Sequence, residues 1–152
     1  MDAPTRRPPT AVRATTDNLG FLLAKAASRW NEALGDALRE RGFPEVRPAY
    51  GSVLLPLFEE DGLRMGRLAA RARLAKQTLT SMARQLERDG LVRREVDGED
   101  GRAWRLYLTE RGRRLLPAAE DALADLEARL AERLSAADAE ALRHGLKGVM
   151  DL

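Results

Sequence analysis

The stretch between residues 62 and 114 constrains this chain most, because two helical patterns are followed there by two alternating ones. Residues 64–72 and 76–89 place apolar side chains at the spacing of helix faces. Residues 91–96 and 103–109 alternate apolar and polar side chains, and the Asp-Gly pairs between them are typical of a hairpin tip. The order of two helices and a hairpin predicts a winged helix-turn-helix.

Basic charge is concentrated in the same stretch. Residues 64–114 hold 14 Lys and Arg and 7 Asp and Glu, a balance of +7, whereas the rest of the chain holds 12 and 17, a balance of −5. A basic module inside an acidic frame is the charge distribution expected of a protein that binds the phosphate backbone of nucleic acid. The charge alone is also compatible with an ordinary solvated helix surface.

The helix predicted at residues 76–89 divides its side chains into two faces. Its apolar face consists of Leu79, Met82, Ala83 and Leu86. The opposite face contains no acid and carries the amide, hydroxyl and guanidinium groups that reach base edges and phosphates in a major groove. We therefore expect DNA contacts from Lys76, Gln77, Thr78, Thr80, Ser81, Arg84 and Arg88.

The hairpin supplies a second predicted contact with DNA. Arginines cluster on it and beside it, among them Arg94, and Arg102 directly follows a glycine at the tip. A guanidinium group in that place can enter a minor groove. Asp100 lies two residues earlier, and we expect it to hold a neighbouring arginine in position. A solvated turn with incidental arginines is the alternative interpretation.

The flanking segments read as long helices that pair two subunits. Asp17 can cap a helix that runs to about residue 41, and its apolar stripe is wider than one short domain needs. Thr109 can cap another, in which Leu116, Leu123 and Leu130 repeat at intervals of seven, as in a coiled coil. Ser135 then opens a last helix with a capping box.

These patterns give a domain organisation. Residues 1–16, without periodicity, are expected to form a flexible arm. Residues 17–45 and 110–152 form a helical dimerisation region, and residues 46–109 form the winged helix-turn-helix. The fold class is mainly α with a small β-hairpin.

The composition excludes several other classes of function. The chain has no cysteine and a single histidine, His144, so disulfides and thiolate metal sites are excluded and we expect no metal and no cofactor. The sequence shows neither a nucleophile paired with a base nor a glycine-rich phosphate loop, so we do not expect an enzyme. No apolar run approaches the ~18 residues of a membrane span, and no signal peptide is recognisable, so we expect a cytoplasmic protein.

The motifs together resemble the MarR (multiple antibiotic resistance regulator) family of transcription factors. The resemblance lies in LAAR at 68–71, KQTLT at 76–80, LERDGLVRR at 86–94, DGEDGR at 97–102 and LTERG at 108–112. It implies a homodimer on a pseudo-palindromic operator, with Arg102 in the minor groove. It also implies a small aromatic or anionic effector that weakens DNA binding. The matching pocket positions are Ala27, Trp30, Asn31, Tyr50 and Leu54, although core packing explains Trp30 and Tyr50 equally well.

Three positions depart from the family pattern. Arg73 stands where a turn glycine is common, and Ala75 stands where a polar cap is usual; each change costs ~1 kcal/mol. The arginine that pairs with the wing aspartate is displaced, because position 85 is Gln and position 84 is Arg. We predict a DNA-binding transcriptional regulator of the MarR type that acts as a repressor. The alternative is a winged-helix protein-interaction module that does not bind DNA.

Overall fold

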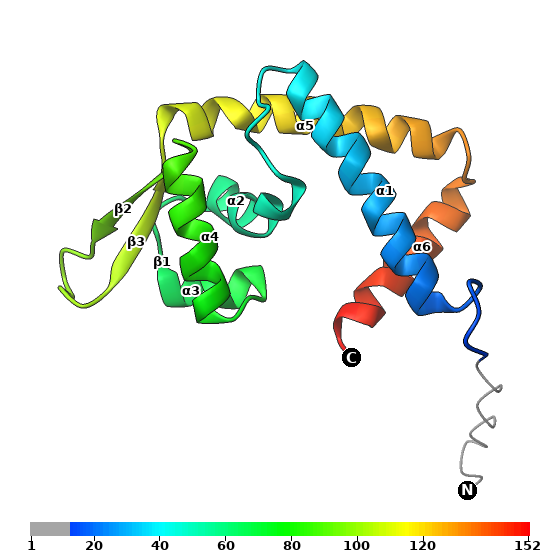
Figure 1. Ribbon diagram of the computed structural model, residues 1–152, viewed down its shortest axis with the longest axis horizontal. Coiled ribbons are helices and arrows are strands. Elements are labelled where there is room, and N and C mark those ends of the chain that lie inside the picture. Colours follow the sequence, from blue (N-terminus) through cyan, green and yellow to red (C-terminus); the bar gives the residue numbers. More distant parts are fainter. Residues whose placement is uncertain (1–12) are drawn as a thin grey trace, which may run out of the picture.

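The computed structural model describes residues 13–152 and has two parts joined by one long helix (Figure 1). Its elements are α1 (Leu19–Glu40), the 3-10 helix η1 (Pro48–Tyr50), α2 (Gly51–Glu59), β1 (Leu63–Arg64), α3 (Met65–Ala72), α4 (Lys76–Arg88), β2 (Val92–Val96), β3 (Trp104–Leu108), α5 (Glu110–Ala131) and α6 (Ala136–Met150). Helices α2, α3 and α4 and the sheet lie at one end of α5, and α6 lies at the other. The predicted fold class, mainly α with a small winged hairpin, is confirmed. Residues 1–12 of the predicted arm lie outside the described residues.

Side-chain caps define where the long helices begin. The Thr109 hydroxyl accepts the Gly112 N–H at 3.1 Å and starts α5, and the Ser135 hydroxyl accepts the Asp138 N–H at 3.1 Å and starts α6, both as predicted. The predicted cap of α1 is wrong by one residue. Asn18, and not Asp17, accepts a backbone N–H at 3.0 Å, and so α1 begins at Leu19.

The sheet contains a strand that the sequence pattern does not predict. Its order is β1-β3-β2, with both pairs antiparallel. Strand β1 is only two residues long, too short to show any alternation, and it pairs Leu63 with Leu106. The two longer strands agree with the predicted hairpin, but their shared apolar face is buried only near the helices. Val96 and Trp104 pair farther out and are 50% and 45% exposed, because the hairpin projects beyond the core.

The main core lies where α2, α3 and α4 meet the sheet. Its largest fully buried side chains are Val53, Leu57, Leu68, Leu79, Leu86, Leu91, Val92, Leu106 and Leu115. Burying each such side chain stabilises the fold by ~1.5–3 kcal/mol. Two of the nine, Leu79 and Leu86, belong to α4, so the core fixes which face of α4 points outward.

The helices outside this core leave apolar side chains in solvent. Helix α5 buries Leu115, Ala122 and Leu126 within the chain, whereas the predicted seam at Leu116, Leu123 and Leu130 is only half-buried. Exposed apolar side chains on α1 are Leu19, Phe21 and Leu22, and those on α6 are Leu142, Leu146, Val149 and Met150. Within residues 13–152, none of the helices combines the length and apolarity needed to cross a bilayer.

Candidate nucleic-acid interface

Helix α4 presents the predicted polar face to solvent. Leu79, Ala83 and Leu86 are buried on its inner side. Its exposed side chains are Lys76, Gln77, Thr78, Ser81, Arg84 and Arg88. Thr80 is half-buried, and its hydroxyl donates to the carbonyl oxygen of Lys76 at 2.8 Å. The residues predicted for the major groove therefore share one accessible helix, with Thr80 at its margin.

The turn before α4 carries both of the local costs expected from the sequence. Arg73 adopts a left-handed backbone with φ 52° and ψ 42°, and its N–H closes the end of α3. For a residue with a Cβ this conformation costs ~1 kcal/mol. The side chain of Ala75 supplies no hydrogen bond at the start of α4. The first N–H groups of α4 are thus left without a side-chain cap, at the end of the helix that carries Lys76 and Gln77.

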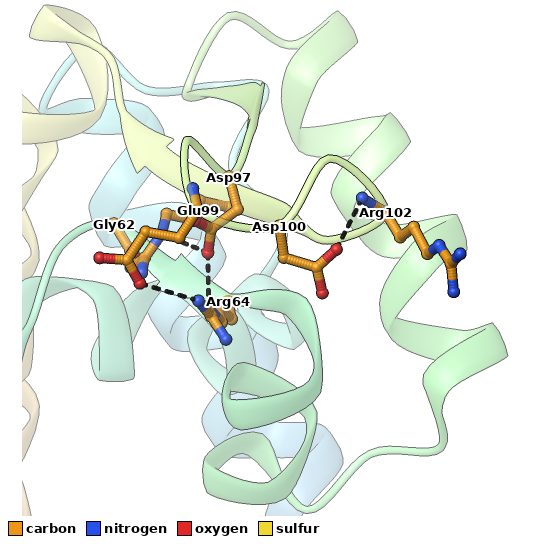
Figure 2. A network of polar contacts seen from close by, with 7 residues as sticks. Gly62, Arg64, Asp97, Glu99, Asp100 and Arg102 are labelled. Carbon is orange, nitrogen blue, oxygen red and sulfur yellow. Dashed lines mark hydrogen bonds and ion pairs between the residues drawn. The ribbon is translucent and has the colours of Figure 1, made fainter.

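The wing is built on a buried carboxylate, that of Asp97 (Figure 2). Its Oδ2 atom accepts hydrogen bonds from the Nε atoms of Arg64 at 2.5 Å and Arg105 at 3.0 Å. Its Oδ1 atom accepts the backbone N–H of Glu99 at 2.9 Å. The side chain is 2% exposed. The Glu99 N–H and then the two guanidinium groups lower the pKa of Asp97 to about 2, against the opposing effect of burial.

Sequence reasoning missed this role of Asp97. The Asp-Gly pair at 97–98 indicates a turn, which is correct, but nothing local indicates that the carboxylate is buried. Its partner Arg64 lies 33 residues away on β1, the strand that was not predicted. The only signal in the sequence is the cluster of arginines around the hairpin, which favours a carboxylate partner nearby.

The predicted support from Asp100 is present, but it acts through the backbone. Its Oδ1 atom accepts the N–H of Arg102 at 3.0 Å, and among residues 13–152 its carboxylate has no guanidinium partner. Position 85, where the family resemblance implies an arginine partner for Asp100, is a glutamine that donates to Asp89 at 3.3 Å. The side chain of Arg102 is exposed and extends away from the Asp97 cluster (Figure 2).

The basic side chains of the site fall into two groups. Arg94 donates to a carboxylate oxygen of Glu87 at 2.8 Å and lies over the ring of Trp104, 5.4 Å from its centroid. Its charge is therefore already compensated. The others predicted to contact DNA have no carboxylate partner within the described part of the chain, although Arg88 donates to the Gln85 amide oxygen at 2.6 Å. This second group consists of Lys76, Arg84, Arg88 and Arg102.

An apolar groove of about 270 Å³ lies between α1, α2 and α5. It is lined by three of the five predicted pocket residues, Trp30, Asn31 and Leu54, and Arg47 lies at it too. Ala27 and Tyr50 do not line it, and for these two residues ligand contact stays a prediction. Ala27 is exposed one helical turn before Trp30, and Tyr50 is buried in the core.

Tyr50 instead connects the start of α2 to the end of α4. Its hydroxyl donates to Oδ2 of Asp89 at 2.5 Å, and Gln85 donates to Oδ1 of the same carboxylate at 3.3 Å. Burial, and then the adjacent Asp89, raise the pKa of Tyr50 to about 12. The hydroxyl therefore stays protonated and remains a donor at any physiological pH.

The described residues do not gather a metal site. No group of three or more His, Asp or Glu side chains within residues 13–152 has the arrangement needed to hold a metal ion.

The chain is similar to known transcription regulators over most of its length. The family model described as MarR family matches residues 48–104. HosA of Escherichia coli O157:H7, a transcriptional regulator, is 30% identical over 119 residues, covering 78% of this chain and 82% of HosA. The HTH-type transcriptional regulator TtmR of Methylorubrum extorquens is 43% identical over 63 residues, but the match spans only 32% of TtmR. The transcriptional repressor CouR, solved on a 23-mer DNA duplex, superposes with a TM-score of 0.76 at 28% identity, covering 93% of this chain and 99% of CouR.

Proposed function

This chain belongs to the MarR family of transcription regulators, and we propose that it is a homodimeric repressor that blocks transcription by occupying a specific operator. Its relatives are transcription regulators and not enzymes. The observation that carries the proposal is the group of uncompensated cations on one surface, Lys76, Arg84 and Arg88 on α4 with Arg102 on the wing. Phosphate contacts of such cations supply most of the affinity for DNA.

The contacts divide between two grooves. The start of α4 enters the major groove, where Lys76, Gln77 and Thr78 reach base edges, as the first residues of a recognition helix do. Arg102 enters the adjacent minor groove from the wing. Thr80, Ser81, Arg84 and Arg88 lie farther along α4 and contact the phosphate backbone. Arg94 takes part only if DNA displaces Glu87, so its contribution is the smallest of the set.

A second copy of the chain covers the exposed apolar side chains of α1 and α6. A monomeric protein rarely leaves two long helices with leucines, valine and phenylalanine in water, and the pattern is typical of an interface. Residues 17–45 and 110–152 then form the dimerisation region, and residues 46–109 the DNA-binding domain. Two such domains related by a two-fold axis bind a pseudo-palindromic operator.

The groove between α1, α2 and α5 is proposed to bind a small aromatic or anionic effector. Its volume lies just below the ~300–1,000 Å³ usual for ligand pockets, and its walls are largely apolar. Arg47 supplies a cation, and Trp30 a ring. A ligand that moves the start of α2 also moves Tyr50 and, through its bond to Asp89, the end of α4. Simple core packing is the competing interpretation of these residues.

Selection of bound duplexes from a random DNA library by the purified protein tests the DNA-binding proposal. We expect a pseudo-palindromic consensus and one dimer per duplex in size-exclusion chromatography with light scattering. Leu146→Glu should give a monomer with much weaker binding. His144→Glu introduces the same charge on the opposite side of α6 and should leave the dimer intact. Recovery of no duplex would refute DNA binding and favour the protein-interaction module.

Thermal shift with matched small ligands tests the effector proposal. We expect benzoate to raise the melting temperature and weaken DNA binding, and Arg47→Gln to reduce the response to benzoate more than the response to benzamide. If a panel of small aromatic acids and amides produces no shift, the groove is only a packing defect.

A further inference from the structure

Asp97 is the one charged side chain that is buried within residues 13–152. A buried carboxylate is costly unless its partners are held in place around it. Here three donors meet it: the guanidinium groups of Arg64 and Arg105 and the backbone N–H of Glu99. The carboxylate has no unsatisfied oxygen, because Oδ1 and Oδ2 each accept at least one of these bonds.

These three donors come from different parts of the wing. Arg64 belongs to β1, Arg105 to β3, and Glu99 to the loop at the hairpin tip. Arg105 also donates from Nη1 to the carbonyl oxygen of Gly62 at 2.7 Å, which ties the cluster to the segment that precedes β1. Asp97 therefore joins the edge strand, the central strand and the tip of the hairpin at one point.

A short series of hydrogen bonds leads from Asp97 to Arg102. The Asp97 N–H donates to the Ala103 carbonyl oxygen at 2.8 Å, and the Ala103 N–H donates to the Asp100 carbonyl oxygen at 3.0 Å. The Asp100 carboxylate then accepts the N–H of Arg102 at 3.0 Å. The loop from 97 to 103 is closed on itself. Its polar side-chain contacts with the rest of the sheet are those of the buried Asp97 and one exposed ion pair, 3.6 Å between Glu99 and Nη2 of Arg64. The Arg102 side chain makes no polar contact with any described residue, so its position depends on this loop.

We propose that Asp97 is a positioning residue for DNA binding, whose carboxylate fixes the wing loop so that Arg102 is already placed to enter the minor groove. A loop that is ordered before binding loses less conformational entropy when it binds DNA, and the protein therefore binds more tightly. Asp97 itself does not touch the duplex. This inference rests on the proposed function, since it concerns how Arg102 contributes to that binding.

A double-mutant cycle between Asp97→Asn and Arg102→Ala tests the proposal. The probe is a fluorescein-labelled duplex recovered from the random library with the wild-type protein, and the readout is its dissociation constant by anisotropy. We expect each single variant to weaken binding by about tenfold, and the double variant to be no weaker than Arg102→Ala alone, because coupled residues are not additive. Additive losses, or an unchanged affinity for Asp97→Asn, would overturn the proposal.

Glu99→Gln provides a matched control. It removes the same unit of charge from the same loop, but its side chain is 88% exposed and its backbone N–H to Asp97 is retained. The Glu99 carboxylate also lies 3.6 Å from Nη2 of Arg64, and an ion pair this exposed contributes little. We expect this variant to bind at least as tightly as the wild type. A loss of affinity equal to that of Asp97→Asn would mean that the charge of the loop, and not the buried Asp97 carboxylate with its donors, is responsible for the effect.

Hydrogen–deuterium exchange of the free protein separates a local from a global effect. Asp97→Asn should speed the exchange of amides 97–103 while the helices of the core keep their protection. If Asp97→Asn does not fold, Arg64→Gln removes one donor and leaves Arg105 in place, and the same cycle is run with it. Faster exchange throughout the chain would overturn the positioning role. Failure of the wild-type protein to bind any duplex refutes the proposed function itself and is a distinct result.

Discussion

Arg84→Ala should reduce the salt dependence of DNA binding, because the Arg84 guanidinium is exposed on α4 and has no carboxylate partner within residues 13–152. Each phosphate neutralised on B-DNA contributes about −0.9 to the slope of log K against log salt concentration. The two cations assigned to the phosphate backbone, Arg84 and Arg88, give about four contacts in a dimer, and therefore a slope of roughly −3.6. Removing Arg84 from both protomers should reduce its magnitude by roughly 1.8.

The change is large enough to measure. Between 50 and 200 mM salt, a slope of roughly −3.6 lowers affinity by about 10², and the Arg84→Ala dimer should lose about tenfold less over the same range. Fluorescence anisotropy with the selected duplex at four or five salt concentrations gives the slope directly.

Arg39→Ala is the matched control for this measurement. Arg39 lies on α1, is 62% exposed and pairs with Asp36, so its removal changes the net charge equally but removes no predicted phosphate contact. Its slope should equal that of the wild type. The reasoning is refuted if Arg84→Ala leaves the slope unchanged, or if Arg39→Ala reduces it by the same amount.

Three further predictions concern stability. Gly112→Ala should destabilise the protein by about 1–3 kcal/mol in urea unfolding, because the added Cβ would stand 2.1 Å from a backbone carbonyl oxygen. Alanine favours helices, and the control Gly148→Ala, whose Cβ meets nothing within 4 Å, should be neutral or stabilising by up to about 1 kcal/mol. Tyr50→Phe should cost about 1–2 kcal/mol in the same assay, because Asp89 loses a buried donor, and an unchanged midpoint would contradict this. The pKa of Asp97 is about 2 in the fold and 3.8 ordinarily, so the unfolded chain binds more protons between these values. The contribution of the Asp97 carboxylate to folding stability is present above about pH 4 and is lost towards pH 2. Between these pH values, the melting temperature of Asp97→Asn should therefore fall less steeply with decreasing pH than that of the wild type.

The parts of the site that follow local rules were predictable from the sequence. The two faces of α4 repeat with the period of a helix, so the exposed polar set could be read from residues 76–88 alone. The Asp-Gly pairs placed the hairpin tip, and Thr109 and Ser135 marked the starts of α5 and α6. In each case the determining contacts lie within four residues along the chain, and helix or turn geometry fixes them.

The tertiary structure decided which charges remain available and which are already used. Arg94 looked equivalent to Arg84 in the sequence, but packing places Glu87 against it. Asp97 looked like a turn residue, but its partner on β1 lies 33 residues away, in a strand of only two residues. Such pairs form because distant segments share one core, and the cost of an unpaired buried charge then selects the partner. No local pattern encodes that choice, whereas periodicity and turn residues determined the helices, the hairpin and the exposed polar face of α4.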